Sequence, residues 1–221
     1  MNFDLTEDQE MLRDSFARFL DNESSTEKVR AAAEQGGFDA QLWQGLAELG
    51  AFGIRVPEEA GGLGLGTFDA VVLMEEAGRT LVSGPLAEAL VAARLLGQVA
   101  GESQADLIES VIGGETVLTL AFHDIAKQPK QFVAGGTVAG AVIGRKGGDI
   151  VLIRLPEGIE GEPTLASTPI AEIDLGALDA ETLGSDSDDL FDAIIEEWKL
   201  LISAALAGLG RQALTLAAAY A

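Results

Sequence analysis

The stretch VPEEAGGLGLG, from Val56 to Gly66, is the most distinctive segment of this 221-residue chain, with four glycines in its last six positions. Glycines at this density suggest a loop that binds phosphate groups. The stretch, however, fits neither GxGxxG nor GxxxxGK followed by Ser or Thr, and the sequence before it does not predict a strand. By its spacing alone, the segment is predicted to be a turn-rich connection between two helices.

Helical patterns lie on both sides of this connection, over residues 1–112. Thr6 and Gln9 form the sequence signature of a capping box, in which each side chain satisfies a free N–H group at a helix start. Gly50 lies where a helix C-cap is expected. Apolar residues then recur at helical spacing in five further sets, which are Leu12, Phe16, Phe19, Leu20; Leu42, Trp43, Leu46, Leu49; Val72, Leu73, Ala77, Leu81; Leu86, Leu90, Ala93, Leu96; and Leu107, Ile108, Val111.

The pattern changes after Gly113 and Gly114. Residues 116–122 and 150–155 are short apolar runs rich in β-formers, and residues 138–143 are a weaker third run, each bounded by glycine or proline turns. An acidic segment, residues 186–189, suits a helix start, and one long helix is predicted from there to Ala221. We therefore expect a mostly α, α+β protein with three units: a helical domain (1–113), a small β-domain (114–184) and a long helix (185–221).

Composition excludes several functional classes. Lys and Arg number 14 against 36 Asp and Glu, a net charge of −22, which disfavours nucleic acids and anionic membranes as partners. The chain has no cysteine and a single histidine, His123, so disulfides, thiolate chemistry and multi-histidine metal sites are not expected. The acidic N-terminus shows no export signal, which predicts a cytoplasmic location.

The most apolar region, residues 200–221, is interrupted by Arg211 and Gln212. A membrane-spanning helix needs about 20 apolar residues without a charge at mid-depth, so a buried helix is the preferred interpretation. An apolar helix of this size must pack against something. Two expectations remain open: the chain is a fragment of something longer, or another subunit covers this surface.

Several acidic or glycine-rich pairs are weak candidates for a site. His123 next to Asp124 could be a base oriented by a carboxylate, but neighbours at a strand end rarely face each other. The pairs Glu75-Glu76 and Glu196-Glu197 could supply two carboxylates, although solvated helix faces are the default in so acidic a chain. Residues 208–213 fit GxGxxG/A literally, yet they lie inside a helical run, which favours close helix packing.

Taken in order, these segments resemble the acyl-CoA dehydrogenase family. Residues 3–9 (FDLTEDQ) with Leu12-Arg13-Asp14 are similar to the family's opening helix, and residues 42–54 with 56–64 to its most recognisable N-terminal stretch. Residues 75–79 (EEAGR) correspond to the EELGR-like segment of the next helix. Gly208 with Tyr220 and Ala221 resembles the start of a long C-terminal helix. The resemblance is strong over residues 1–113, weak over 114–184 and moderate thereafter.

The resemblance implies a helical N-terminal domain, a β-barrel-like middle domain and a C-terminal helical bundle, assembled into dimers or tetramers. It also implies FAD between the last two domains. A Glu removes the α-proton of an acyl-CoA thioester while hydride leaves the β-carbon for the flavin, which supplies the electron sink. An electron-transfer flavoprotein then reoxidises the flavin. Such enzymes belong to lipid metabolism.

The chain departs from the family where the flavin is held. The family motif TEPxxGSD is replaced by residues 122–129 (FHDIAKQP), so Phe122 and His123 are the positions at which the resemblance implies cofactor contacts. Trp198 stands where one branch of the family has its catalytic base, with Glu197 beside it. The other known position for the base would lie beyond Ala221. The catalytic base is therefore left unassigned.

Two functions follow as hypotheses. The first is an acyl-CoA dehydrogenase-like flavoprotein oxidoreductase, incomplete and inactive as this chain alone. The alternative is a non-catalytic subunit, deficient in the flavin motif, of a heteromeric acyl-CoA dehydrogenase. Expected partners are an acyl-CoA substrate, an electron-transfer flavoprotein and further subunits in a homo- or hetero-oligomer. A third hypothesis, a helical binding module without flavin, requires the match at residues 56–66 to be accidental.

Overall fold

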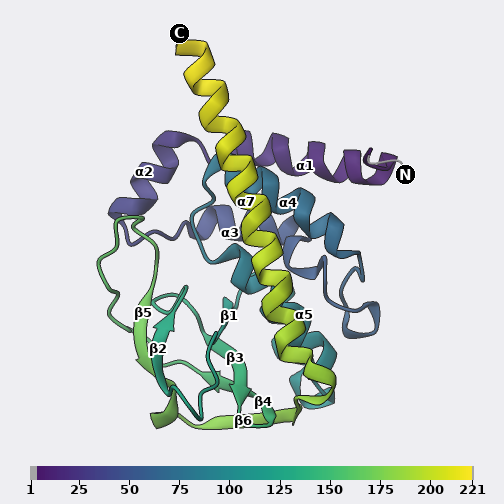
Figure 1. Cartoon of the computed structure of the whole chain (residues 1–221), viewed down its shortest axis with the longest axis vertical. Coiled ribbons are helices and arrows are strands. Elements are labelled where there is room, and N and C mark those ends of the chain that lie inside the picture. The colour runs from purple at the N-terminus through teal and green to yellow at the C-terminus, as the bar shows by residue number, and fades with distance from the viewer. Residues whose placement is uncertain (1–3, 221) are drawn as a thin grey trace.

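The computed structural model describes residues 4–220 and places helices at both ends of the chain with strands between them (Figure 1). The helices are α1 (Glu7–Glu23), α2 (Thr26–Glu34), α3 (Ala40–Glu48), α4 (Thr67–Thr80), α5 (Leu86–Val99), α6 (Ala105–Ile112) and α7 (Leu190–Tyr220). The strands are β1 (Leu118–Leu120), β2 (Lys130–Val133), β3 (Ala141–Lys146), β4 (Asp149–Arg154), β5 (Ala171–Asp174) and β6 (Ala180–Ser185). The mostly α, α+β prediction is confirmed.

Local signals define the helix ends as the sequence predicted. At the start of α1, the Thr6 hydroxyl accepts a hydrogen bond from the Gln9 backbone N–H at 3.2 Å, and the Thr6 N–H donates to the Gln9 side chain at 3.1 Å. Gly50, after α3, has φ of +80°, a left-handed conformation that glycine adopts at little cost. The acidic residues before α7 form a short 3-10 turn, and the Asp186 carboxylate accepts the Phe191 backbone N–H at 2.9 Å.

The segment from Val56 to Gly66 is a turn-rich connection, as its spacing predicted. It folds back on the residues before it, because Leu63 N donates to Gly53 O at 2.8 Å and Leu65 N donates to Ile54 O at 2.9 Å. A side chain at Gly62 would overlap the carbonyl oxygen of Val56. The glycines therefore allow two backbone segments to approach closely, and the connection holds its shape through main-chain hydrogen bonds.

The strands that follow α6 and precede α7 in the chain form two sheets. The larger has the order β1-β3-β4-β6, in which β1 and β3 are parallel and the other pairs are antiparallel; β2 and β5 form a separate antiparallel pair. Of the predicted apolar runs, 116–122 contains β1, while 138–143 and 150–155 overlap β3 and β4 in part. The sequence did not single out β2, β5 and β6, because β2 and β5 alternate buried and exposed over four residues each and β6 has no fully buried residue.

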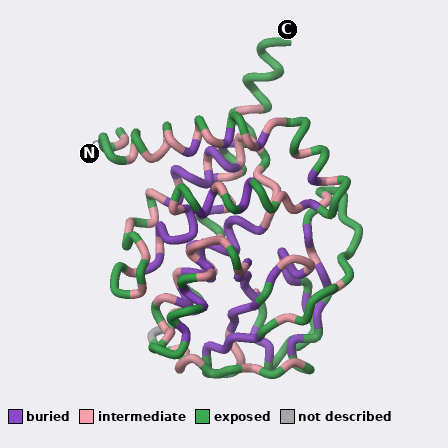
Figure 2. Tube along the Cα trace, turned by 180° about the vertical axis from the view of Figure 1, so that it is seen from behind, coloured by how far each residue is buried: buried purple, intermediate pink, exposed green. Residues whose placement is uncertain are grey.

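The buried residues form two clusters, one on each side of the larger sheet. Buried stretches lie mostly in the interior of the trace, whereas its outer turns are largely exposed (Figure 2). The first joins the helices to one face of the sheet, including Leu118, Ile143 and Leu152. The second lies between the opposite face and the β2–β5 pair, including Val142 and Ile173. The alternation of side chains along each strand produces this division. The end of β1 consequently lies against the helical layer, and the residues after it approach α5 and α7.

Helix α7 packs chiefly on α4 and α5. The backbones of α4 and α7 approach closely at two glycines, since a side chain at Gly78 would overlap the Ala205 carbonyl and one at Gly208 would overlap the Glu75 carbonyl. The GxGxxG/A match at residues 208–213 is thus part of a helix contact, as expected. The last turns of α7 project from the body of the molecule (Figure 1), and several of their apolar side chains are exposed.

By length and composition alone, α7 is apolar enough to cross a membrane, the one such helix in residues 4–220. A single helix of this kind is weak support for a span. Only 17% of its most apolar 18-residue stretch is buried, so the buried-helix interpretation of residues 200–221 is wrong for this chain by itself. Its contacts with α4 through Gly208 show one face packed against protein.

Candidate functional site at the α5–α7 junction

The segment after β1 contains the two residues predicted to contact a cofactor. Phe122 is half-buried, whereas His123 is exposed. The Gln131 side chain bridges this segment: it accepts the His123 backbone N–H at 3.0 Å and donates to the His123 carbonyl at 3.2 Å and to the Gln128 carbonyl at 3.0 Å. Gln131 is buried, so these bonds fix the backbone around His123.

The carboxylate of Asp124 accepts hydrogen bonds from backbone N–H groups, and none of its hydrogen bonds involves the His123 ring. Its carboxylate accepts the N–H groups of Gly147 at 2.8 Å and Ala126 at 3.0 Å, and Lys127 lies 3.4 Å away. Burial alone would raise the pKa of Asp124, but these donors hold it below its usual value. Asp124 therefore has a structural role, because it ties the segment after β1 to the β3–β4 turn.

Phe122 meets an aromatic residue of α7. The ring centroids of Phe122 and Trp198 are 4.5 Å apart, with an interplanar angle of 59°, a distance typical of favourable aromatic contacts. The indole N–H of Trp198 donates to the carboxyl group of Glu88 on α5 at 3.0 Å. Phe122, Trp198 and Glu88 therefore connect the end of β1 to α7 and α5.

Glu88 contributes a buried carboxyl group to this junction. Burial raises its pKa, although the Trp198 N–H opposes that shift. Glu88 also lines an apolar cleft of about 240 Å³ between α4, α5 and α7. No local signal in the sequence singles it out, because it occupies the first turn of α5, where acidic residues are common for helix-dipole reasons.

A buried ion cluster lies one residue from Trp198. The Glu197 carboxylate accepts the Nε–H of Arg55 at 2.7 Å and also pairs with Arg94 of α5. Arg55 donates further to Thr67 Oγ1 at 3.0 Å and to the Leu65 carbonyl, which links the Val56–Gly66 connection to α7. Burial lowers the pKa of both guanidinium groups. The side chain of Glu197 is only 4% exposed, so the solvated-face interpretation of the Glu196-Glu197 pair is wrong for Glu197.

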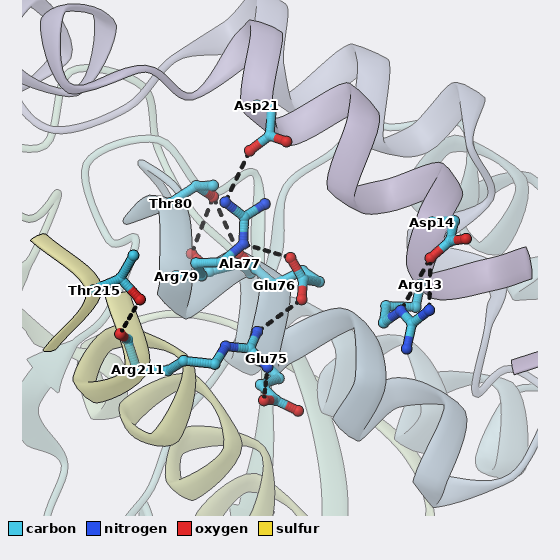
Figure 3. A network of polar contacts seen from close by, with 10 residues as sticks. All are labelled: Arg13, Asp14, Asp21, Glu75, Glu76, Ala77, Arg79, Thr80, Arg211 and Thr215. Atoms are coloured by element: carbon cyan, nitrogen blue, oxygen red, sulfur yellow. Dashed lines mark hydrogen bonds and ion pairs between the residues drawn. The ribbon is translucent and has the colours of Figure 1, made fainter. Parts of the chain in front are cut away.

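A second ion network joins α7 to α4 and α1 (Figure 3). Arg211 reaches Glu75 at 2.6 Å and Glu76 at 2.9 Å, while Arg79 reaches Glu76 at 2.5 Å and Asp21 at 2.8 Å. Glu76 is buried, so the solvated-face interpretation is wrong for it as well. Both of its partners are cationic, and the network holds three helices together.

A metal site is not indicated in the described part of the chain, where no group of three or more His, Asp or Glu side chains is placed to hold an ion. The main clefts among the described residues are lined by residues other than Phe122 and His123.

Comparison with known proteins places the chain in a family. Residues 6–108 match the model of the acyl-CoA dehydrogenase N-terminal domain. The acyl-CoA dehydrogenase IpdE2 of Mycolicibacterium smegmatis is 31% identical over 219 residues, which cover 98% of this chain and 65% of that protein. The chain belongs to the acyl-CoA dehydrogenase family. The resemblance predicted from the sequence is confirmed.

Other known proteins match in part or by fold. The benzylmalonyl-CoA dehydrogenase of Aromatoleum aromaticum is 39% identical over 113 residues, covering 49% of this chain and 29% of that protein. A Tcur3481-Tcur3483 steroid ACAD variant shares the fold with a TM-score of 0.83 and 24% identity, covering 97% of this chain and 66% of that one. The ChsE4-ChsE5 complex of Mycobacterium tuberculosis gives a TM-score of 0.82 at 21% identity, over 100% of this chain and 68% of that one.

The acyl-CoA dehydrogenase family implies FAD, and the residues after β1 can be tested for it. A flavin ring against Phe122 needs an open ring face and free hydrogen-bond donors for its polar edge. Trp198 packs against Phe122 in a tilted contact, its N–H is used by Glu88, and the His123 N–H is used by Gln131. These residues do not fit a flavin held there by this chain alone. The assignment of Phe122 and His123 to a cofactor site stays a prediction.

Proposed function

We propose that this chain takes part in an acyl-CoA dehydrogenase, an oxidoreductase that forms a double bond between the α and β carbons of an acyl-CoA thioester. The similarity to IpdE2 across 98% of the chain carries the proposal. The shared fold supports it, because the helices, the two sheets and α7 match a steroid ACAD with a TM-score of 0.83. The chain spans 65% of the length of IpdE2, so the activity is proposed for the assembled enzyme.

A second candidate is a non-catalytic partner subunit of a heteromeric acyl-CoA dehydrogenase. The contact between Phe122 and Trp198, with the indole N–H bound to Glu88, favours this candidate. It fills the place where the sequence resemblance implies flavin contacts, and Trp198 cannot accept a proton as a carboxylate base would. In this candidate, the flavin is bound by another chain. The ChsE4-ChsE5 complex, whose name joins two different chains, has the same fold.

Further partners and three structural units complete the proposal. We propose an acyl-CoA substrate, an electron-transfer flavoprotein, and a homo- or hetero-oligomer in the cytoplasm. Exposed apolar side chains along α7 support assembly, among them Leu206, Leu214 and Leu216. The family match at residues 6–108 supports a helical unit over 1–113, followed by units over 114–184 and 185–221. The net charge of −22 supports the absence of nucleic-acid and anionic-membrane partners.

The intact mass and absorbance spectrum of the natively purified complex test the proposal. A yellow preparation with one FAD per copy of this chain supports the first candidate. A chain that is colourless alone and supports acyl-CoA oxidation only with a flavin-bearing second chain supports the second candidate. As a control, the complex is denatured to release any bound flavin, and the absorbance of the released flavin gives its amount per chain. A native complex without flavin and without thioester oxidation would contradict both candidates.

A further inference from the structure

Two consecutive residues of α7 are held by the same neighbouring helix. Glu197 pairs with Arg94, and Trp198 donates its indole N–H to Glu88 at 3.0 Å, with both partners on α5. Arg55 adds a third contact from the Val56–Gly66 side, donating its Nε–H to Glu197 at 2.7 Å. Adjacent helical residues point about 100° apart. Fixing both therefore fixes the rotation of α7 about its own axis at this level.

The charge balance makes Glu197 the central member of this cluster. Its side chain is 4% exposed, and those of Arg55 and Arg94 are 13% and 20% exposed. A neutral side chain at this position would leave two cations close together with no carboxylate between them. Such a loss disturbs a partly buried cluster far more than loss of a surface ion pair does. The first turns of α7 are then expected to move, and Trp198 with them.

We propose that Glu197 is a positioning residue that, with Arg55 and Arg94, holds Trp198 across Phe122 and so closes this chain to a flavin ring. The inference rests on the second candidate function, in which the flavin is bound by another chain. The polar contacts of Glu197 are with the two arginines. Its effect passes through the adjacent Trp198, whose indole occupies the space and whose N–H anchors it to Glu88.

Tryptophan fluorescence tests the positioning role directly. The chain has two tryptophans, so the variant Trp43→Phe leaves Trp198 as the single tryptophan. In that background, Glu197→Gln should raise the acrylamide quenching constant of Trp198 about twofold, because the indole becomes more accessible once the buried pairs are lost. Glu196→Gln is the matched control: Glu196 is 72% exposed and pairs with Lys199, and this variant should leave quenching unchanged. Equal quenching in the two variants would overturn the positioning role.

Flavin binding tests the closing role. Each variant is titrated into a solution of lumiflavin, which is the flavin ring system without its side chain. The change in lumiflavin fluorescence reports binding. Trp198→Ala should bind lumiflavin at least about tenfold more tightly than Trp43→Phe, since an opened aromatic site can accept a planar ring. Trp198→Phe keeps a ring in place and should bind no better than the control. Equal binding by Trp198→Ala and Trp198→Phe would overturn the closing role.

The two measurements are independent of catalysis. Neither uses an acyl-CoA or a second chain, so a failure of the proposed function would be seen in the native complex and not in these titrations. Far-ultraviolet circular dichroism confirms that each variant retains the helical content of the parent. Glu197→Gln preserves the shape of the side chain, which keeps the fluorescence test valid if Trp198→Ala does not fold.

Discussion

The substitution Gly208→Ala should destabilise the protein through a backbone clash between two helices. A methyl group at residue 208 of α7 would overlap the carbonyl oxygen of Glu75 on α4 and lie 3.0 Å from the amide nitrogen of Arg79. Both neighbours are backbone atoms, so no side-chain rotation can relieve the overlap. The two helices must separate, and the contact of Arg211 with Glu76, 2.9 Å long, is then stretched as well.

Two opposing effects determine how much Gly208→Ala changes the free energy of unfolding. Alanine in place of glycine inside a helix stabilises by about 1 kcal/mol, while overpacking costs typically about 1–3 kcal/mol, and a rigid backbone contact belongs at the upper end. The net loss for Gly208→Ala is therefore about 2 kcal/mol. Gly210 lies two residues further along α7, and a methyl group added there would have nothing within 4 Å, so Gly210→Ala should gain about 1 kcal/mol from helix propensity alone.

Thermal and urea unfolding of the two variants beside the parent measures this difference. For a chain of this size, Gly208→Ala should lower Tm by about 4–8 °C and Gly210→Ala should raise it by about 2–4 °C. The same amino-acid change in the same helix thus has opposite signs. If Gly208→Ala unfolds at or above the Tm of Gly210→Ala, the close approach of α4 and α7 is not what limits the side chain at residue 208.

Three further predictions concern titratable groups. Asp124→Asn should lower the free energy of unfolding by about 1–3 kcal/mol near pH 7, measured by urea melts. The difference from the parent should shrink as pH falls through the depressed pKa of Asp124, because protonation then removes the charged hydrogen bonds from the parent too. Burial raises the pKa of Glu88, so the parent loses stability as pH rises above the unfolded value of 4.5. The stability of Glu88→Gln relative to the parent should therefore increase as pH rises from about 4.5 towards neutral. Arg211→Met should lower the free energy of unfolding by about 1 kcal/mol, and by less in high salt, because Arg211 is half-exposed. Buried Glu76 still has Arg79 as an ion-pair partner in this variant. A loss of stability near that of Gly208→Ala would contradict this expectation.

Much of the fold could be predicted because its signals are local. Thr6 with Gln9 defines the start of α1, and apolar spacing identifies the helices from α3 to α6. The continuous apolar runs identify β1, β3 and β4, whereas β2, β5 and β6 escaped because short strands with few buried residues look like loops. Their pairing is set by residues far away in the chain. The fold class therefore followed from the sequence, but the complete sheets did not.

The candidate site was harder to predict, because its partners are distant in sequence. Glu197 is 142 residues from Arg55 and 103 from Arg94. Sequence reasoning noted Trp198 for its position and Phe122 for its place in the resemblance, but no local signal predicted that their rings would meet. Adjacent glutamates posed the same difficulty: Glu196 is exposed and Glu197 buried, since neighbours on a helix point to different sides.

The sequence by itself determined the family, the order of the helices and of the most apolar strands, and the turn-rich connection at residues 56–66, since caps, periodicity and glycine conformation act over a few residues. Tertiary structure alone decided which acidic residues are buried and which aromatic ring contacts Phe122. Burial and ion pairing depend on how α4, α5 and α7 pack, and packing brings together side chains that the chain itself separates by a hundred residues or more.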